Sequence, residues 1–202
     1  MKTAVATLAA TAALLSLDGH AGVFATIGGG ASDWPDCGSG AVSCDHKDGT
    51  WFGRVGFGIP LVPFLGVEAR YVDLGRNKSS LPFANVPIDT TVESKGAGVG
   101  AVLQVPIPLD LALNAVAGFA RMKGSVTQHD AIIGTTTEGG VVTSVGFSGS
   151  RTKTNPYYGI GIDYRLNNSN FSVGAEATRY RVDFGSKDNV DTYTLSFTYR
   201  FL

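Results

Sequence analysis

The chain ends in a strict alternation of large apolar residues with small or polar ones. From position 193 to 201 every odd residue is aromatic or Leu, and every even residue is Thr, Ser or Arg. Successive side chains of a strand point to opposite faces, so this spacing predicts a β-strand with one apolar face. Soluble domains seldom end in such a strand. The apolar face consists of Tyr193, Leu195, Phe197, Tyr199 and Phe201.

Seven further segments alternate in the same way, and turn or loop residues separate them. The first of the eight has the weakest contrast between its two faces, since Phe24 and Thr26 differ little from Val23 and Ala25. The eight segments are 22–30, 54–59, 65–71, 96–105, 111–122, 158–166, 171–178 and 193–202.

Long and short connectors also alternate. The long ones are 31–49, 76–91 and 127–154, the short ones are 60–63, 106–110 and 167–169, and only 186–188 breaks the rule by being short. Outer-membrane barrels have short periplasmic turns and long outward loops. We therefore predict an all-β fold, an eight-stranded antiparallel up-and-down transmembrane β-barrel.

A soluble eight-stranded barrel such as a lipocalin is the rival fold, and its apolar faces would point inward. The second face of these strands carries Gly, Ser, Thr and charges, so the soluble fold would lack a core. The 27 Gly and 16% charged residues also suit short strands in a tight barrel. A net charge of -1 indicates no nucleic-acid partner.

The amino terminus has the features of an export signal. Lys2 precedes an apolar run from Ala4 to Leu17, and Gly19 and Ala21 are the small residues that a signal peptidase needs. The run is shorter than the roughly 20 residues of a membrane-spanning helix. We expect a signal peptide at 1–21 and a single outer-membrane barrel domain at 22–202.

Two segments share a short motif. Residues 66–75 and 174–185 both contain Gly-x-Glu followed by Tyr and Asp, with two extra residues in the second copy. In this motif and in its strand number the chain resembles the OmpA-like family of small outer-membrane β-barrels. The resemblance implies a monomer in the outer membrane of a Gram-negative bacterium, in contact with outer-membrane lipid and lipopolysaccharide.

The same resemblance implies insertion by the outer-membrane assembly machinery, which reads a terminal strand that ends in an aromatic residue. Here that strand is the one from Tyr193 to Phe201, and Leu202 after Phe201 is a departure from the pattern. Many family members carry a peptidoglycan-binding domain after the barrel, and none follows here, so no cell-wall tether is expected.

Charged residues on the lumen faces are the best candidates for chemistry. Eight strands leave an interior that side chains just fill, so these charges must pair with one another or with trapped water. One interpretation is a polar plug. The other is a gate, in which Glu68 or Glu176 exchanges Arg partners and opens a narrow water path. The candidate lumen ion-pair network is Arg54, Glu68, Arg70, Asp163, Arg165, Glu176 and Arg200.

Cys37 and Cys44 lie in the first long connector. In an exported protein a disulfide is the default for such a pair. It would restrain the loop and contribute roughly 2–3 kcal/mol on the chain-entropy model. A metal site with Asp36, Asp45 and His46 is the alternative, and it has only one nearby imidazole.

The sequence contains little that indicates an enzyme. The mature chain has only His46 and His129, neither in a His-x-Ser arrangement such as a lipid A deacylase needs. The segment around Ser148 is similar to a nucleophile elbow but lacks an α/β context. We expect no enzyme activity, no metal and no cofactor.

The third long connector, 127–154, is rich in β-prone residues. We expect it to continue its strands beyond the membrane as a hairpin that could bind a host surface, a phage or another envelope protein. The predicted function is a non-enzymatic outer-membrane barrel with a structural and surface-recognition role through its outer loops. The alternative is a narrow, low-conductance pore.

Overall fold

A computed structural model describes residues 22–35, 43–45, 47–59, 62–83, 86–133, 143–167, 169–183 and 187–201. All of its strands lie in one antiparallel sheet. No helix among the described residues is long and apolar enough to cross a membrane. The strands are β1 (Val23–Asp33), β2 (Ser43–Asp45), β3 (Lys47–Ile59), β4 (Val62–Phe83), β5 (Val86–Ile107), β6 (Leu111–Ile133), β7 (Thr143–Arg165), β8 (Phe171–Asp183) and β9 (Lys187–Phe201).

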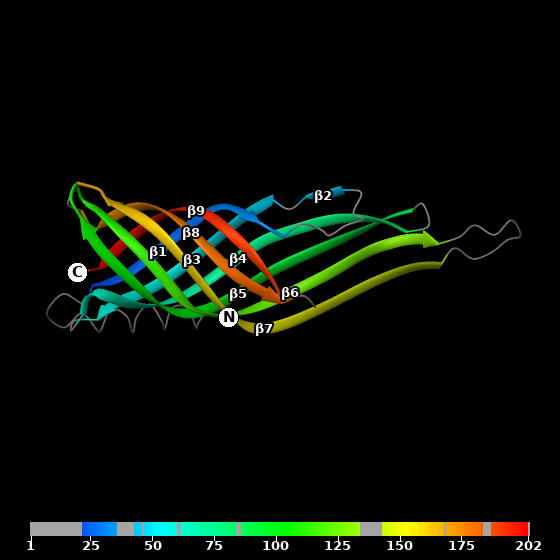
Figure 1. Cartoon of the computed structure of the whole chain (residues 1–202), viewed down its shortest axis with the longest axis horizontal. Helices are drawn as coiled ribbons and strands as arrows, with labels where there is room; N and C mark the ends of the chain where they lie inside the picture. The colour runs from blue at the N-terminus through cyan, green and yellow to red at the C-terminus, as the bar shows by residue number, and fades with distance from the viewer. Residues whose placement is uncertain are drawn as a thin grey trace, which may run out of the picture.

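The sheet closes because β1 pairs with the last strand. β1 lies antiparallel to β9 from Val23↔Phe201 to Asp33↔Asp191, and it pairs with β3 on its other side. Each later strand pairs with the next, so that eight strands, β1 and β3–β9, form the wall seen in Figure 1. The predicted eight-stranded up-and-down barrel is confirmed, including its weakly patterned first strand.

The outer ends of the barrel are longer than the sequence predicted. We expected a polar connector at 76–91, and this was wrong, because β4 and β5 stay paired out to Phe83↔Val86. The three residues of β2 add a further short strand along β4, at Lys78–Ser80. When both faces of a hairpin meet water, strands with polar and β-branched side chains form as readily as strands with an apolar face. Such strands have no apolar alternation by which the sequence could reveal them.

The hairpin expected within 127–154 is confirmed. β6 and β7 remain paired out to Ile133↔Thr143. In Figure 1 the β4–β5 and β6–β7 hairpins project together at the right, while the carboxyl terminus lies at the left, at the end with the tight turns.

Alternation along each strand sends apolar side chains outward. On β8, Phe171 and Val173 are exposed while Ser172 and Glu176 are buried. Ile160 of β7 exposes 70% of its surface, as a side chain does when lipid is its only neighbour. The soluble alternative, with apolar faces inward, is therefore excluded.

Aromatic pairs mark both edges of this outward apolar band. The ring centroids of Trp51 and Tyr71 lie 5.3 Å apart at the outer edge, and those of Phe171 and Tyr199 lie 4.8 Å apart at the inner edge. Aromatic girdles at the two interfaces are typical of membrane barrels.

Candidate functional site

Four charged side chains meet in the middle of the lumen, and we call them the central cluster. Arg54 of β3 donates from Nη1 to Oε2 of Glu176 at 2.8 Å and lies 3.5 Å from Oε2 of Glu68. Arg70 of β4 donates from Nε to Oε1 of Glu68 at 2.9 Å and from Nη1 to Oε1 of Glu176 at 2.6 Å. Two guanidinium groups face two carboxylates, so the cluster carries no net charge.

Neutral hydroxyl groups complete the hydrogen bonds of the cluster. Tyr157 donates to Oε1 of Glu68 at 2.9 Å, and Thr178 donates to Oε1 of Glu176 at 2.5 Å. Arg70 also donates to the hydroxyl oxygen of Tyr180 at 3.0 Å. Buried charges need such partners, because a charged group without hydrogen bonds in a low-dielectric interior loses its hydration without compensation.

Aromatic rings shield the cluster from water. The ring of Phe52 lies 5.0 Å from the guanidinium carbon of Arg70 and 5.7 Å from that of Arg54. The ring of Tyr157 lies 5.3 Å from the guanidinium of Arg70. Cation–π contacts of this kind gain strength on desolvation. Side-chain exposure in the cluster is accordingly between 0% for Glu68 and 7% for Glu176.

The cluster connects strands from opposite sides of the barrel. Arg54, Glu68 and Arg70 come from the neighbouring strands β3 and β4, whereas Glu176 comes from β8. β1 and β9 lie between these two groups in the wall. The ion pairs therefore brace the lumen across its width.

Glycines make room for the tyrosine that serves Glu68. A Cβ on Gly100 of β5 would lie 2.5 Å from the hydroxyl oxygen of Tyr157, and one on Gly118 of β6 would lie 2.8 Å from its ring. Both distances are shorter than real contacts allow. The absence of side chains at these two positions is thus what admits the Tyr157 ring into the lumen.

An apolar layer fills the lumen on the outer side of the central cluster. On β4 the lumen positions after Arg70 are Val72 and Leu74, and on β8 Val182 follows Tyr180. Trp34 is buried at this level and donates from Nε1 to the carbonyl oxygen of Leu74 at 3.2 Å. The layer consists of Trp34, Val72, Leu74, Met122, Val182 and Val190, none more than 4% exposed.

The remaining predicted lumen charges lie apart from the central cluster. Asp163 and Arg200 approach to 3.9 Å near the periplasmic end, and Arg200 donates to Oγ of Ser172 at 3.0 Å. Arg165 is exposed at the end of β7, and no ion pair found among the described residues includes it. The structure therefore brings together four of the seven predicted residues and places a looser pair at the inner mouth.

The alternating residues of the last strand point away from the lumen. Tyr193, Leu195 and Phe197 expose 56%, 72% and 43% of their surface. Cys37, Asp36 and His46 lie outside the described residues, so the disulfide stays a prediction; the backbone of Cys44 belongs to β2 and pairs with Ser79. The part of the chain that the structure describes contains no group of three His, Cys, Asp or Glu side chains placed to hold a metal ion.

Sequence reasoning missed the apolar layer and the two lumen tyrosines. A signal for them existed, because Leu74, Val182 and Tyr180 share the parity of the charged lumen residues on their strands. Large side chains at the lumen positions that follow Arg70 on β4 and Glu176 on β8 could have indicated a lumen filled by side chains.

Comparison with known proteins agrees with this geometry. The family model for the outer membrane protein beta-barrel domain matches residues 3–201. A search of curated proteins found no match.

Several solved structures have the same fold. The chain is similar to Ail, the attachment invasion locus protein of Yersinia pestis, crystallised with the heparin analogue sucrose octasulfate, with 19% identity, a TM-score of 0.55 and coverage of 90% of this chain and 99% of Ail. Neisserial surface protein A is 14% identical, with a TM-score of 0.53, and the match covers 89% of this chain and 97% of the Neisserial protein. OprG from Pseudomonas aeruginosa is 13% identical, with a TM-score of 0.52, and the match covers 91% of this chain and 98% of OprG. The TM-scores show a shared fold, and at these low sequence identities the matches show the fold alone.

Proposed function

The chain belongs to the family of outer-membrane β-barrel proteins, and from this premise we propose that it is a closed, non-enzymatic barrel that presents a recognition surface through its outer hairpins. Its location is the outer membrane of a Gram-negative bacterium. The observation that carries the proposal is the pair of hairpins, β4–β5 and β6–β7, which stay paired far beyond the outer aromatic edge of the apolar band.

The filled lumen supports a role at the surface rather than in transport. Leu74 and Val190 of the apolar layer are 0% exposed, so water reaches them from neither end. The central cluster lies beneath this layer and is itself nearly dry. A barrel blocked at two levels contributes through its outside and its loops.

The exposed parts of the hairpins carry cations. The side chains of Arg76 and Arg151 are 59% and 54% exposed, and each has one acidic partner, Glu93 and Asp183. Ordered strands with exposed side chains and free edges are a common platform for recognition. Because Ail was crystallised with a heparin analogue, immobilised heparin is a suitable first probe for this chain.

Cells that display the full chain would be compared with cells that display a variant in which a two-residue turn replaces 79–90. A second variant would shorten the β6–β7 hairpin at 127–149. We expect retention of the full chain on heparin and loss of retention for at least one variant, with heat-modifiable gel mobility preserved in all three. Equal retention of all three would contradict hairpin recognition of this probe class.

A narrow pore is the second candidate, and the position of Arg54 favours it. Arg54 lies near the carboxylates of both Glu68 and Glu176, and its Nε is buried without a hydrogen-bond partner. An exchange between the two carboxylates would be a gating movement. Glu68→Ala and Arg200→Ala should then raise single-channel conductance in planar bilayers, and unchanged conductance in both variants would remove this candidate.

Three features of the maturation pathway belong to the same proposal. Residues 1–21 act as the export signal, the outward alternation on β9 is the assembly signal, and a disulfide joins Cys37 to Cys44. The barrel is proposed to work as a monomer. Mass spectrometry of the protein from outer membranes, with and without reduction, tests the cleavage site and the disulfide together.

A further inference from the structure

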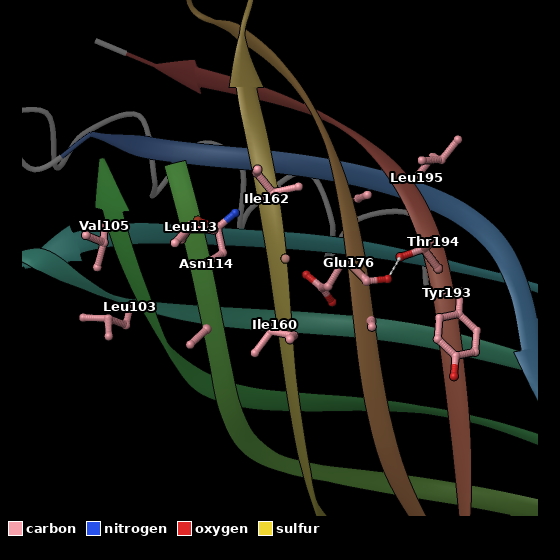
Figure 2. A pocket seen from close by; sticks show the side chains of 14 residues that line it. Leu103, Val105, Leu113, Asn114, Ile160, Ile162, Glu176, Tyr193, Thr194 and Leu195 are labelled. Atoms are coloured by element: carbon pink, nitrogen blue, oxygen red, sulfur yellow. Dashed lines mark hydrogen bonds between the residues drawn. The ribbon is translucent and has the colours of Figure 1, made fainter. Parts of the chain in front are cut away.

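Two shallow, open hollows lie on the lipid-facing surface of the described barrel. One has a volume of about 910 Å³ and lies over β5–β9; Figure 2 shows it, with Ile160, Ile162 and Leu195 along its walls. The other has a volume of about 830 Å³ and extends from β1 to β7 across β3–β6; we call it the β3–β6 hollow. Small outward residues form its floor, namely Gly53, Ala69 and Ala97, between the larger Val55, Tyr71 and Val99.

The outer end of the β3–β6 hollow is cationic. Arg121 belongs to its lining and follows Phe119 on the outward face of β6. Lys123 is the next outward residue on β6, and Lys95 of β5 stands directly opposite Lys123 in the register. All three side chains are exposed. Like charges directly opposite in a sheet are destabilising unless something neutralises them.

In the described part of the chain, this group of cations forms no ion pair with an acidic side chain. None of the ion pairs found among the described residues includes Arg121, Lys123 or Lys95. Glu93, two residues before Lys95, is paired with Arg76 at 2.8 Å. Asp73 is directly opposite Lys95 in the register of β4 and β5, and its Oδ1 accepts from the backbone N–H of Gly75 at 3.0 Å. This hydrogen bond leaves the charge of Asp73 in place, so Asp73 offsets part of the positive charge of the three cations and leaves the group net positive.

Two hydroxyl groups stand beside the cations. Thr154 of β7 is opposite Arg121 and lines the hollow, and Thr152 is opposite Lys123. An Arg fork, two ammonium groups and two hydroxyl groups on neighbouring strands are donors that suit a phosphate.

The other hollow provides the contrast. Its floor includes Ala177 of β8, and the next outward residue on that strand is Arg179. Arg179 donates from both Nε and Nη2 to the carboxylate of Asp191, each at 2.6 Å. The charge of Arg179 is therefore neutralised by an ion pair within the protein. Only the β3–β6 hollow combines an apolar floor with cations that lack an ion pair in the described part of the chain.

We propose that the β3–β6 hollow binds the lipid A part of lipopolysaccharide, with a phosphate held by Arg121, Lys123 and Lys95 and an acyl chain lying over Gly53, Ala69 and Ala97. The cations lie at the same end as the long hairpins, which is the outer leaflet, where the anionic lipid is lipopolysaccharide. The inference rests on the membrane location and does not depend on recognition by the hairpins.

The test uses the full chain extracted from outer membranes, delipidated in detergent and titrated with bisphosphorylated lipid A in EDTA, with native mass spectrometry as the readout. The double variant Arg121→Gln/Lys123→Gln should bind about tenfold more weakly or worse, since it removes charge-assisted contacts. Ala97→Leu should weaken binding by filling the floor of the hollow without changing charge. Matched controls in the other hollow, Arg179→Gln and Ala177→Leu, should bind as the parent does.

Dephosphorylated lipid A should bind to the parent as weakly as bisphosphorylated lipid A binds to the double variant. Preserved gel mobility shows that each variant is folded. The proposal is overturned if the double variant binds like the parent, if Arg179→Gln weakens binding equally, or if phosphatidylglycerol binds as tightly as lipid A and responds equally to the double substitution.

Discussion

Arg70 and Glu176 join opposite sides of the barrel through a buried ion pair of 2.6 Å, although 106 residues separate them in the chain. Glu176 also accepts from Arg54 at 2.8 Å, so one carboxylate serves two guanidinium groups. This sharing makes Glu176 the position at which the central cluster is most easily tested.

Glu176→Ala should lower the free energy of unfolding by about 3–5 kcal/mol, because it leaves two arginines buried with one carboxylate. Urea unfolding in lipid vesicles, followed by gel mobility, measures the loss. Glu93→Ala is the matched control, since its pair with Arg76 is largely exposed and should contribute about 0–1 kcal/mol. Losses of equal size in the two variants would contradict a bracing role for the cluster.

Tyr157→Phe should cost about 1.5–3 kcal/mol, the range for a hydrogen bond to a charged group, because Glu68 loses the hydroxyl donor at 2.9 Å. The same unfolding assay measures it. Tyr193→Phe removes a hydroxyl from a lipid-facing ring that is 56% exposed and should be close to neutral. A Tyr157→Phe variant as stable as the parent would show that Glu68 is satisfied without Tyr157.

Gly100→Ala should destabilise the barrel by about 1–3 kcal/mol through overpacking. Its Cβ would fall 2.5 Å from the hydroxyl oxygen of Tyr157 and 2.7 Å from the carbonyl oxygen of Ala117. Gly53→Ala is the control, because a Cβ at Gly53 meets no atom within 4 Å. If both glycine variants unfold at the same urea concentration, the space around Tyr157 is not limiting.

Leu74→Ala should cost about 2–5 kcal/mol, the range for a large-to-small change in a packed interior, since Leu74 is 0% exposed in the apolar layer. Leu195→Ala on the lipid face should cost less than about 1 kcal/mol. A second readout is conductance: the polar change Leu74→Ser should raise it only if the layer closes the lumen. A conducting parent barrel would show that the layer is open in a membrane.

For the central cluster, the sequence predicted which side chains face the lumen and did not predict which of them meet. Parity on β3, β4 and β8 assigned Arg54, Glu68 and Glu176 to the lumen, because each side chain's face follows from its own strand. Parity gave no sign that Arg165 would be exposed at a strand end or that Arg200 would pair only loosely with Asp163. Such outcomes depend on the height of each residue along the barrel axis.

The long hairpins show a second limit. Apolar alternation stops at Tyr71 on β4, although the strand continues to Phe83. Beyond the membrane both faces of a hairpin meet water, so no apolar period marks its strands.

The sequence by itself determined the number of wall strands, their direction and which face of each meets lipid. A period of two is a local property, and a bilayer requires closure of every backbone group without help from the solvent. Only the tertiary structure decided that Tyr157 reaches Glu68, that Leu74 is fully buried in the lumen, and that Lys95 stands beside Lys123. Those contacts depend on the stagger of strands around a closed barrel, which depends on all of the pairings at once.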